Sequence, residues 1–323
     1  MEYSYRTASE LLELCARENL SVAEVTLRAE SEIGSGTRAE LMARMTDYYA
    51  RMKASVARGL EITDRSASGL SGGDAKKVLA HSQNQRVSPL GQSFEKSMAY
   101  ALAVLETNAA FGQIVATPTA GSAGIAPACL LTWQEARAAS DEQAALGLFT
   151  AAGVGKIIGY GACFSGAQGG CQAEIGSACC MAAAALCELD GGTPAQVLHA
   201  ATIALKNTLG LVCDPIGGYV EAPCTKRNAL FTLHAFGAST LALSGVESIV
   251  PFDEVVGALR EIGRAMPRRY KETSEGGLAV TPTGLRFSPA RAKNRLRVLP
   301  SENRSSENTS CKNVVPEIDP KFI

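Results

Sequence analysis

Three features are missing from this 323-residue sequence: an excess of one charge, a long apolar run, and a basic leader followed by apolar residues. The 31 Lys and Arg residues nearly balance the 32 Asp and Glu residues, for a net charge of −1, so no bulk field attracts nucleic acid or acidic lipid. The N-terminus has no secretory-signal pattern, and no stretch approaches the length that spans a bilayer. We therefore expect a cytoplasmic protein that binds neither nucleic acid nor membranes.

Alternating β-branched segments are also scarce, and helical patterns dominate. Residues 1–60 predict N-terminal helices, since Ser21 and Glu24 have the spacing of a capping box. Residues 61–89 are polar and rich in glycine, which predicts a loop between helices. Further helical stretches are expected at about 94–105, 123–136, 141–152, 173–189, 194–210, 226–244 and 253–264. The sequence therefore predicts a mainly α fold.

The composition changes near Pro289. From there to residue 323 the chain is rich in Arg, Asn, Ser and Glu, and such a segment buries too little apolar surface to order itself. We predict one helical domain over residues 1–288 and a polar, mobile tail over residues 289–323.

The sequence contains ten cysteines. Without a secretory signal the thiols are expected to stay reduced, and a group of reduced cysteines indicates metal binding or catalysis. The alternative is that some are small buried hydrophobes. We favour this alternative for Cys179, Cys180 and Cys187, because the Ala-rich run from Ser177 to Leu189 is typical of a helix packed on all sides.

Three other cysteines, Cys171, Cys213 and Cys224, lie in loops rich in glycine or next to proline. Glycine lets the backbone approach closely, so that N–H groups reach the sulfurs of a metal cluster. The spacing of these cysteines matches neither a Cys-x-x-Cys zinc pattern nor a ferredoxin run. From spacing and composition alone, a metal site is therefore one interpretation among others.

The residues around these cysteines resemble the alpha chain of the iron–sulfur-dependent L-serine dehydratases (L-serine ammonia-lyases). The resemblance covers about residues 30–287, with several motifs in the same order. In chain order these motifs are Ser68–Ala75, Glu106–Ala109, Val115–Pro127, Ser165–Ala167, Gly170–Ala178, Leu205–Asn207, Gly210–Pro215, Pro223–Cys224, Arg227–Ala229, Met266–Pro267, Lys271–Thr273 and Gly276–Gly284.

The resemblance implies a helical domain whose Gly-rich loops hold a [4Fe–4S] cluster on Cys171, Cys213 and Cys224. One iron would then lack a protein thiolate and act as a Lewis acid on the β-hydroxyl of L-serine. A base would remove the α-proton, water would leave, and the enamine product would hydrolyse to pyruvate and ammonia. Neither the residues nor the resemblance identify this base.

Further site residues are expected in the same motifs. Thr119, Gly121 and Ser122 lie in a turn that opens a helix, where N–H groups and hydroxyls could bind the substrate carboxylate. Ordinary helix capping is the alternative for this turn. The loop with Ser71 and Gly72 is a similar candidate for substrate binding.

Three residues are expected beside the cluster: Ser165, Arg227 and Asn228. The last two follow Cys224 by three and four positions and could share a helix face with it, either touching cluster or substrate or only packing behind them. Elsewhere, Lys156 is more typical of a solvated lysine than of a base. His199 and His234 are expected to be structural residues.

The sequence departs from the family pattern before and within the first cysteine loop. It has Cys163 in the segment Gly161–Phe164, where the family often has Asn-Ala-Ser-Ile, and Gln168 where an acidic residue is common. An altered substrate preference is one consequence, and Cys163 could be a spectator near the cluster.

Three other functions remain open from the sequence. Elimination of hydrosulfide from L-cysteine would use the same chemistry. A pyridoxal-phosphate lyase would need Lys76 or Lys156 as its Schiff base. A non-catalytic iron–sulfur sensor would need a partner-recognition or DNA-binding module, and the sequence shows none.

A second protein chain is also expected. Family members that work alone carry another module with a Ser-Ser-Ser-His-Thr-like segment, and this sequence contains no such segment. The resemblance therefore implies a separate beta chain and a hetero-oligomer.

Overall fold

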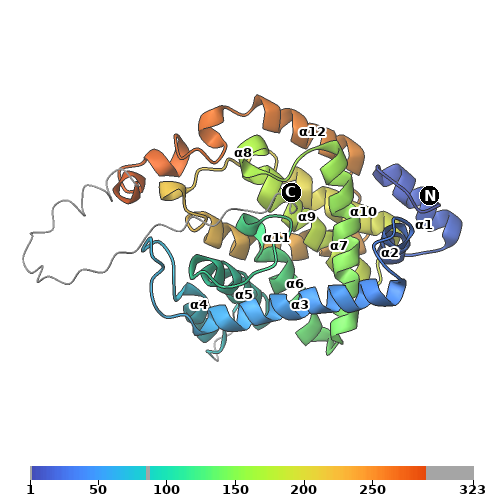
Figure 1. The fold of residues 1–323 in the computed structure, drawn as a ribbon, viewed down its shortest axis with the longest axis horizontal. Helices are drawn as coiled ribbons and strands as arrows, with labels where there is room; N and C mark the ends of the chain where they lie inside the picture. The colour runs from blue at the N-terminus through green and yellow to red at the C-terminus, as the bar shows by residue number, and fades with distance from the viewer. Residues whose placement is uncertain (1, 85–87, 289–323) are drawn as a thin grey trace, which may run out of the picture. The chain divides into compact units, whose positions relative to one another are not determined.

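The computed structural model describes residues 2–84 and 88–288, so the tail predicted over residues 289–323 lies outside the described residues. The described residues form helices and short helical turns (Figure 1). Their β structure is limited to one isolated bridge between Cys213 and Lys271. The prediction of a mainly α fold is confirmed.

The N-terminal region forms three helices, as predicted: α1 (Ala8–Glu18), α2 (Val22–Glu32) and α3 (Arg38–Glu61). Each begins after a hydroxyl residue whose side chain accepts a hydrogen bond from a backbone N–H of the first turn: Thr7, Ser21 and Thr37. Such caps satisfy N–H groups that have no partner inside the helix.

The predicted loop over residues 61–89 is wrong in part, because it contains helix α4 (Asp74–Ser82). The cap of α4 is a carboxylate from α5 (Gln92–Ala109), far away in the sequence. Glu106 accepts hydrogen bonds from the backbone N–H groups of Gly73 at 3.1 Å and Asp74 at 2.7 Å. A local pattern cannot reveal a cap that tertiary packing supplies.

The remaining long helices agree with the prediction apart from their ends. They are α6 (Ile125–Arg137), α7 (Asp141–Gly161), α9 (Ser177–Leu189), α10 (Pro194–Lys206), α11 (Cys224–Leu243) and α12 (Phe252–Ala265). Helix α7 continues past residue 152, where the predicted helix ends, to Gly161. A Cβ on Gly153 would lie 2.2 Å from Thr26 Oγ1, so this glycine allows α7 to pack closely against α2.

Helix α9 lies at the centre of the fold and packs against α6, α7, α10 and α11 (Figure 1). Cys179, Cys180 and Cys187 are buried in it, and burial raises the pKa of all three thiols. They are therefore small core residues, as predicted.

Helix α7 is long and apolar enough to cross a membrane by length and composition, contrary to the expectation from the sequence. Within the fold, 67% of its most apolar window is buried against other helices. This burial is typical of a central helix in a globular domain.

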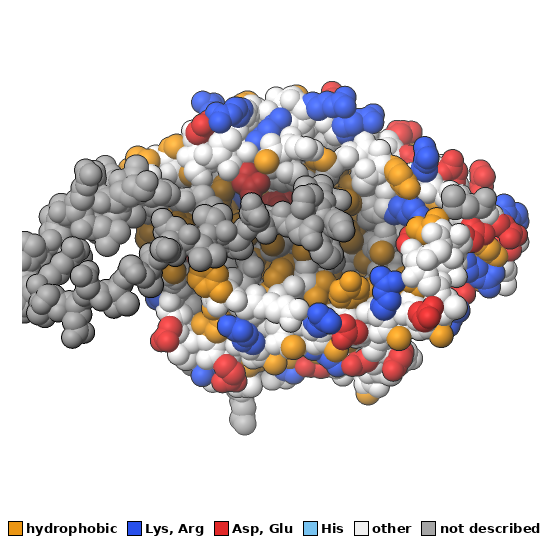
Figure 2. Space-filling view, viewed as in Figure 1, with side chains coloured by type: hydrophobic (Ala, Val, Ile, Leu, Met, Phe, Trp, Pro, Cys, Tyr) orange, Lys and Arg blue, Asp and Glu red, His pale blue; other side chains and the backbone are white. Residues whose placement is uncertain are grey.

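Short elements connect the helices around the cysteine loops. They are η1 (Ala120–Ser122), α8 (Gly166–Gly169), the π-helical turn η2 (Gln172–Gly176), η3 (Ile216–Gly218), η4 (Arg268–Tyr270), η5 (Gly277–Val280) and η6 (Gly284–Phe287). Figure 2 shows apolar side chains along a hollow in the middle of one face, with charged side chains of both signs around it.

Candidate metal centre

Two of the three predicted cysteines meet in the structure. The sulfur atoms of Cys171 and Cys213 and a carboxylate oxygen of Glu174 all lie within 4.8 Å of one another. All three residues are buried, with exposed fractions of 1%, 2% and 8%. Thiolate and carboxylate are both metal-binding groups, so this cluster can hold a metal.

Cys171 is held in place by its neighbour Gln172. The backbone N–H of Gln172 donates to the carbonyl of Leu211 at 2.9 Å, and its side-chain oxygen accepts from the N–H of Gly210 at 2.8 Å. These bonds join the start of η2 to the segment that leads to Cys213. A π-helical turn such as η2 is frequent at functional sites.

Cys213 is held by the segment after η4. Its backbone N–H donates to the carbonyl of Tyr270, and its carbonyl accepts from the N–H of Glu272, both at 2.8 Å. This bridge explains why a motif around Lys271, remote in sequence, accompanies the cysteine motifs.

Gly166 allows the loop before Cys171 to approach Glu174 and Cys213 closely. A Cβ at this position would lie 2.8 Å from Glu174 Oε2 and 3.1 Å from Cys213 Sγ. Any side chain here would enter the space between the thiol and the carboxylate. The predicted role of glycine, close backbone approach, therefore applies to Gly166.

Cys224 is the first residue of α11 and is 5% exposed. It is not one of the three groups within 4.8 Å, but its thiol interacts electrostatically with both other cysteines. Burial, and then the charge of Cys171, raises the pKa of Cys224 to about 12. The structure therefore places all three predicted ligands in one buried region.

Arg227 is the cation of this region. Its Nη1 donates to Cys171 Sγ at 3.2 Å and to the carbonyl of Val212 at 2.8 Å, while Nη2 donates to Asp214 Oδ1 at 2.9 Å. A guanidinium suits such a role because it stays charged and offers several N–H groups in one plane. The structure shows Arg227 in contact with the sulfur of Cys171, one of the three predicted ligands, and its contact with a cluster or substrate stays a prediction.

Replacing Arg227 by Gln should reduce the free energy of unfolding by about 3–5 kcal/mol, because Asp214 would keep a buried charge without its partner. The side chains of the pair are only 15% and 5% exposed. Urea unfolding of the metal-free chain measures this. The matched control is Arg268→Gln, whose ion pair with Glu275 is solvent-exposed and should change stability by less than about 1 kcal/mol. Equal losses of stability in the two variants would contradict a buried ion pair between Arg227 and Asp214.

The titratable groups of the centre shift one another's pKa values. A hydrogen bond from Cys213 lowers the pKa of Cys171, and Arg227 acts in the same direction. The same bond, together with burial, raises the pKa of Cys213. Burial raises the pKa of Glu174, and nearby Glu272 adds to this effect, while the Thr119 hydroxyl opposes it. A thiolate therefore forms at Cys171 more readily than at Cys213.

Asn228, 0% exposed, connects the start of α11 with the turn before α6. Its Nδ2 donates to the carbonyls of Gly121 at 2.8 Å and Cys224 at 2.9 Å, and its Oδ1 accepts from the N–H of Gly124 at 3.0 Å. These three bonds engage the whole amide. Asn228 therefore positions the turn next to the cysteine.

The turn with Thr119, Gly121 and Ser122 reaches the centre through Glu174. The Thr119 hydroxyl lowers the pKa of the nearby Glu174 carboxylate, and a Cβ on Gly121 would lie 3.4 Å from this carboxylate. Ser122 is fully buried, and its hydroxyl lies 3.1 Å from that of Thr119 in a capping box. Ser122 therefore acts in helix capping, while Thr119 and Gly121 border the metal centre.

Ser71 is engaged elsewhere, by Glu221, which lies three residues before Cys224. Glu221 accepts hydrogen bonds from the hydroxyls of Ser66, Ser68 and Ser71. The neighbouring Gly72 packs against the carbonyl of Asp64. The predicted substrate loop is therefore anchored to the Cys224 turn, and Glu221 was missed because this contact joins distant segments.

Of the other candidates, Ser165 directly precedes Gly166, which faces the centre, and the two histidines are already partnered. Ser165 begins α8 and is half-buried, and Gly169 of that helix packs against Cys163. The ring of His199 accepts a hydrogen bond from Ser248 N–H, and the ring of His234 bonds to the Ala204 carbonyl. Both histidines are structural, as predicted.

Glu174 was missed by the sequence reasoning. It lies inside a run that reads as helix, yet it is the sole acidic residue between Glu142 and Glu188. A carboxylate placed almost one turn after Cys171 in such an apolar stretch is the signal that could have identified it.

Comparisons with known proteins identify the family of this chain. A family model described as the serine dehydratase alpha chain matches residues 17–279. The chain is 44% identical over 280 residues to a probable L-serine dehydratase alpha chain of Bacillus subtilis, covering 87% of this chain and 93% of that one. It is 43% identical over 278 residues to the L-serine dehydratase alpha chain of Peptoniphilus asaccharolyticus, covering 86% and 95%. The chain belongs to the serine dehydratase alpha chain family.

A longer relative shows how the family varies. The chain is 38% identical over 282 residues to the L-serine dehydratase of Streptomyces coelicolor, covering 87% of this chain but 62% of that protein. The chain thus corresponds to one part of the longer proteins and to nearly all of the separate alpha chains.

Proposed function

We propose that this chain is the alpha subunit of an L-serine dehydratase, which converts L-serine to pyruvate and ammonia. The observation that carries the proposal is the buried convergence of Cys171, Cys213 and Glu174, with Cys224 nearby, beside a turn that borders the same carboxylate. The names of its relatives support serine as the substrate.

The residues present fit a [4Fe–4S] cluster on three cysteines. The donor set consists of three buried thiols, Gly166 leaves space beside one of them, and Arg227 balances the negative charge of another. Cys171, Cys213 and Cys224 would hold the cluster. When bound, a cluster with one iron lacking a thiolate supplies a Lewis acid that makes hydroxide a better leaving group.

The chain's own residues would then orient serine and move its proton. The backbone and hydroxyl of Thr119, next to Gly121, could bind the substrate carboxylate at the edge of the centre. Glu174 is the carboxylate that faces the same space, so it is positioned to accept the α-proton of serine. Ser71 and Ser122 would support these segments through Glu221 and Thr119.

Pyruvate release from L-serine by the anaerobically reconstituted chain, with its beta chain present, tests the proposal. The same assay with L-cysteine distinguishes hydrosulfide elimination. A pyridoxal-phosphate enzyme is not supported, because Lys76 is exposed and Lys156 pairs with Glu30. Release from cysteine but not from serine would contradict serine deamination.

A separate beta chain is part of this proposal. The turns η3, η5 and η6 pack against one another. Four apolar side chains on them or directly after them are each about 40% exposed (39–44%): Tyr219, Leu278, Val280 and Leu285. The backbone N–H of Leu278 donates to Asp214, which follows the ligand Cys213. An exposed apolar group attached to the centre is typical of an interaction surface.

The lone reconstituted chain should show little serine turnover, and adding the beta chain should restore it, because the longer relatives include a further part. Steady-state assays with and without the beta chain measure this. Leu278→Asp should weaken the restoration, whereas Leu230→Asp, on the exposed side of α11, should not. Full turnover by the lone chain, unchanged by the partner, would show that no beta chain is needed.

A further inference from the structure

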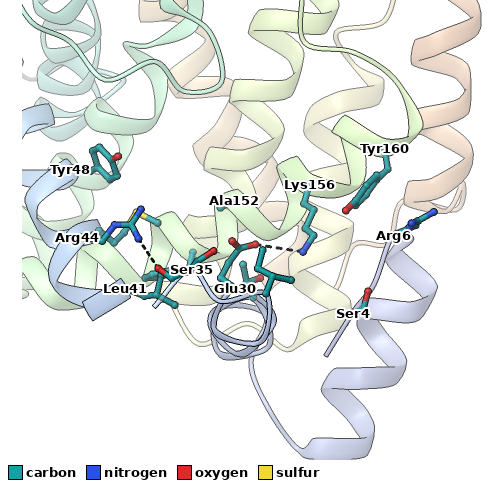
Figure 3. A pocket seen from close by; sticks show the side chains of 14 residues that line it. Ser4, Arg6, Glu30, Ser35, Leu41, Arg44, Tyr48, Ala152, Lys156 and Tyr160 are labelled. Atoms are coloured by element: carbon teal, nitrogen blue, oxygen red, sulfur yellow. Dashed lines mark hydrogen bonds and ion pairs between the residues drawn. The ribbon is translucent and has the colours of Figure 1, made fainter. Parts of the chain in front are cut away.

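A second cavity lies between the N-terminal helices and α7 (Figure 3). Its volume is about 560 Å³, which is in the range of small-molecule sites. Helix α7 contributes one stripe of four residues to it: Phe149, Ala152, Lys156 and Tyr160. None of the residues that line it belongs to the cysteine centre.

The cavity carries more positive than negative charge. Arg6, Arg44 and Lys156 line it, against the single carboxylate of Glu30, whose oxygen lies 3.5 Å from Lys156 Nζ (Figure 3). Arg6 stacks over the ring of Tyr160 with its guanidinium carbon 5.4 Å from the ring centre. In the part of the chain that the structure describes, neither arginine forms an ion pair with a carboxylate.

Two further carboxylates, Glu10 and Glu40, lie near Arg6 and Arg44 but do not line the cavity. Both accept hydrogen bonds in the capping boxes that begin α1 and α3. Lys156 is mostly buried, with its side chain 22% exposed. A cation in such a partly dry setting attracts an anion more strongly than one in water.

Most of the remaining lining is apolar or aromatic, with the hydroxyl residues Ser4, Thr26 and Ser35 among it. Its apolar and aromatic members include Ile33, Leu41, Met45, Tyr48 and Phe149. A neighbouring apolar cavity of about 370 Å³ shares Met45, Tyr48 and Ala152, and Thr117 and Pro118 are also part of its lining. The two cavities thus have part of an apolar wall in common.

We propose that this cavity is a second ligand site, distinct from the cysteine centre, for a small carboxylate with an apolar body. The carboxylate would lie at Lys156, and the apolar body would lie against Met45 and Phe149. An apolar body explains the lining, and an anionic head explains the excess of cations.

Binding is tested on the metal-free chain, so the result does not depend on the proposed activity. The probe is the fluorescent apolar anion 1-anilinonaphthalene-8-sulfonate, displaced by 4-phenylbutyrate or by 4-phenylbutylamine, which has the same body and the opposite charge. The acid should displace the probe and the amine should not. Equal displacement by the two would overturn the proposal, because the site would then not select anions.

Variants place the binding in this cavity. Ala152→Phe fills it from an exposed position on α7 and should abolish displaceable binding. Lys156→Gln should weaken 4-phenylbutyrate about tenfold, and Lys156→Arg should retain it. Arg51→Gln, which removes an exposed cation paired with Asp47, is the control and should change nothing. Unchanged binding in folded Ala152→Phe would overturn the proposal.

Discussion

Replacing Cys171, Cys213 or Cys224 by serine is expected to remove bound iron and serine deamination together. A serine hydroxyl has too high a pKa to replace a thiolate ligand, and a cluster with two thiolates would not keep its structure. Because the cluster would provide several kcal/mol of transition-state stabilisation, activity should fall by roughly a thousandfold or more. Iron analysis and pyruvate assays on each reconstituted variant measure both effects.

Cys187→Ala is the control for these variants. Cys187 is equally buried, but it lies in α9 and burial raises its pKa to about 12, as for a core thiol. It should keep its iron and most of its activity, with a modest loss of stability. A Cys213 variant that still bound a full complement of iron would contradict the ligand assignment.

Glu174→Gln is expected to keep the cluster and lose activity by about 10²–10⁴-fold, the usual contribution of a positioned acid or base. Gln has the same shape, but its amide cannot accept the α-proton. The effect should appear in kcat, while the iron content and the visible spectrum stay as in the parent chain. If iron is lost instead, Glu174 is a metal ligand and not the base.

Glu188→Gln is the matched control. Glu188 is also a carboxylate whose pKa burial raises, but it accepts hydrogen bonds from the N–H groups of Val22 and Ala23 at the start of α2. Its replacement should lower stability by about 1–3 kcal/mol without changing kcat. A similar loss of kcat in both variants would show that the Glu174 effect comes from folding and not from chemistry.

The three cysteines proposed as ligands could be singled out from the sequence because their signal is local. Each lies in a segment marked by glycine or proline, and these segments carry the family resemblance. The core cysteines of α9 could be separated from them for the same reason, since an Ala-rich run without breaks predicts a buried helix. The helical fold follows from periodicity and from caps such as Thr7 and Ser21.

The missed features depend on contacts between distant segments. Glu106 caps α4 from α5, Glu221 collects three serine hydroxyls from another loop, and Glu174 reaches Cys213 only after folding. Each is a buried carboxylate whose partners lie more than 30 positions away. Charge and periodicity along the chain identify such residues as polar, but they do not show which groups they bind.

Iron and acid-labile sulfide content of the anaerobically reconstituted chain tests the central claim most directly. A cluster on Cys171, Cys213 and Cys224 predicts about four iron and about four sulfide ions per chain, all lost in the three serine variants. A single iron without sulfide would contradict it, because Cys171, Cys213 and Glu174 would then form a mononuclear site.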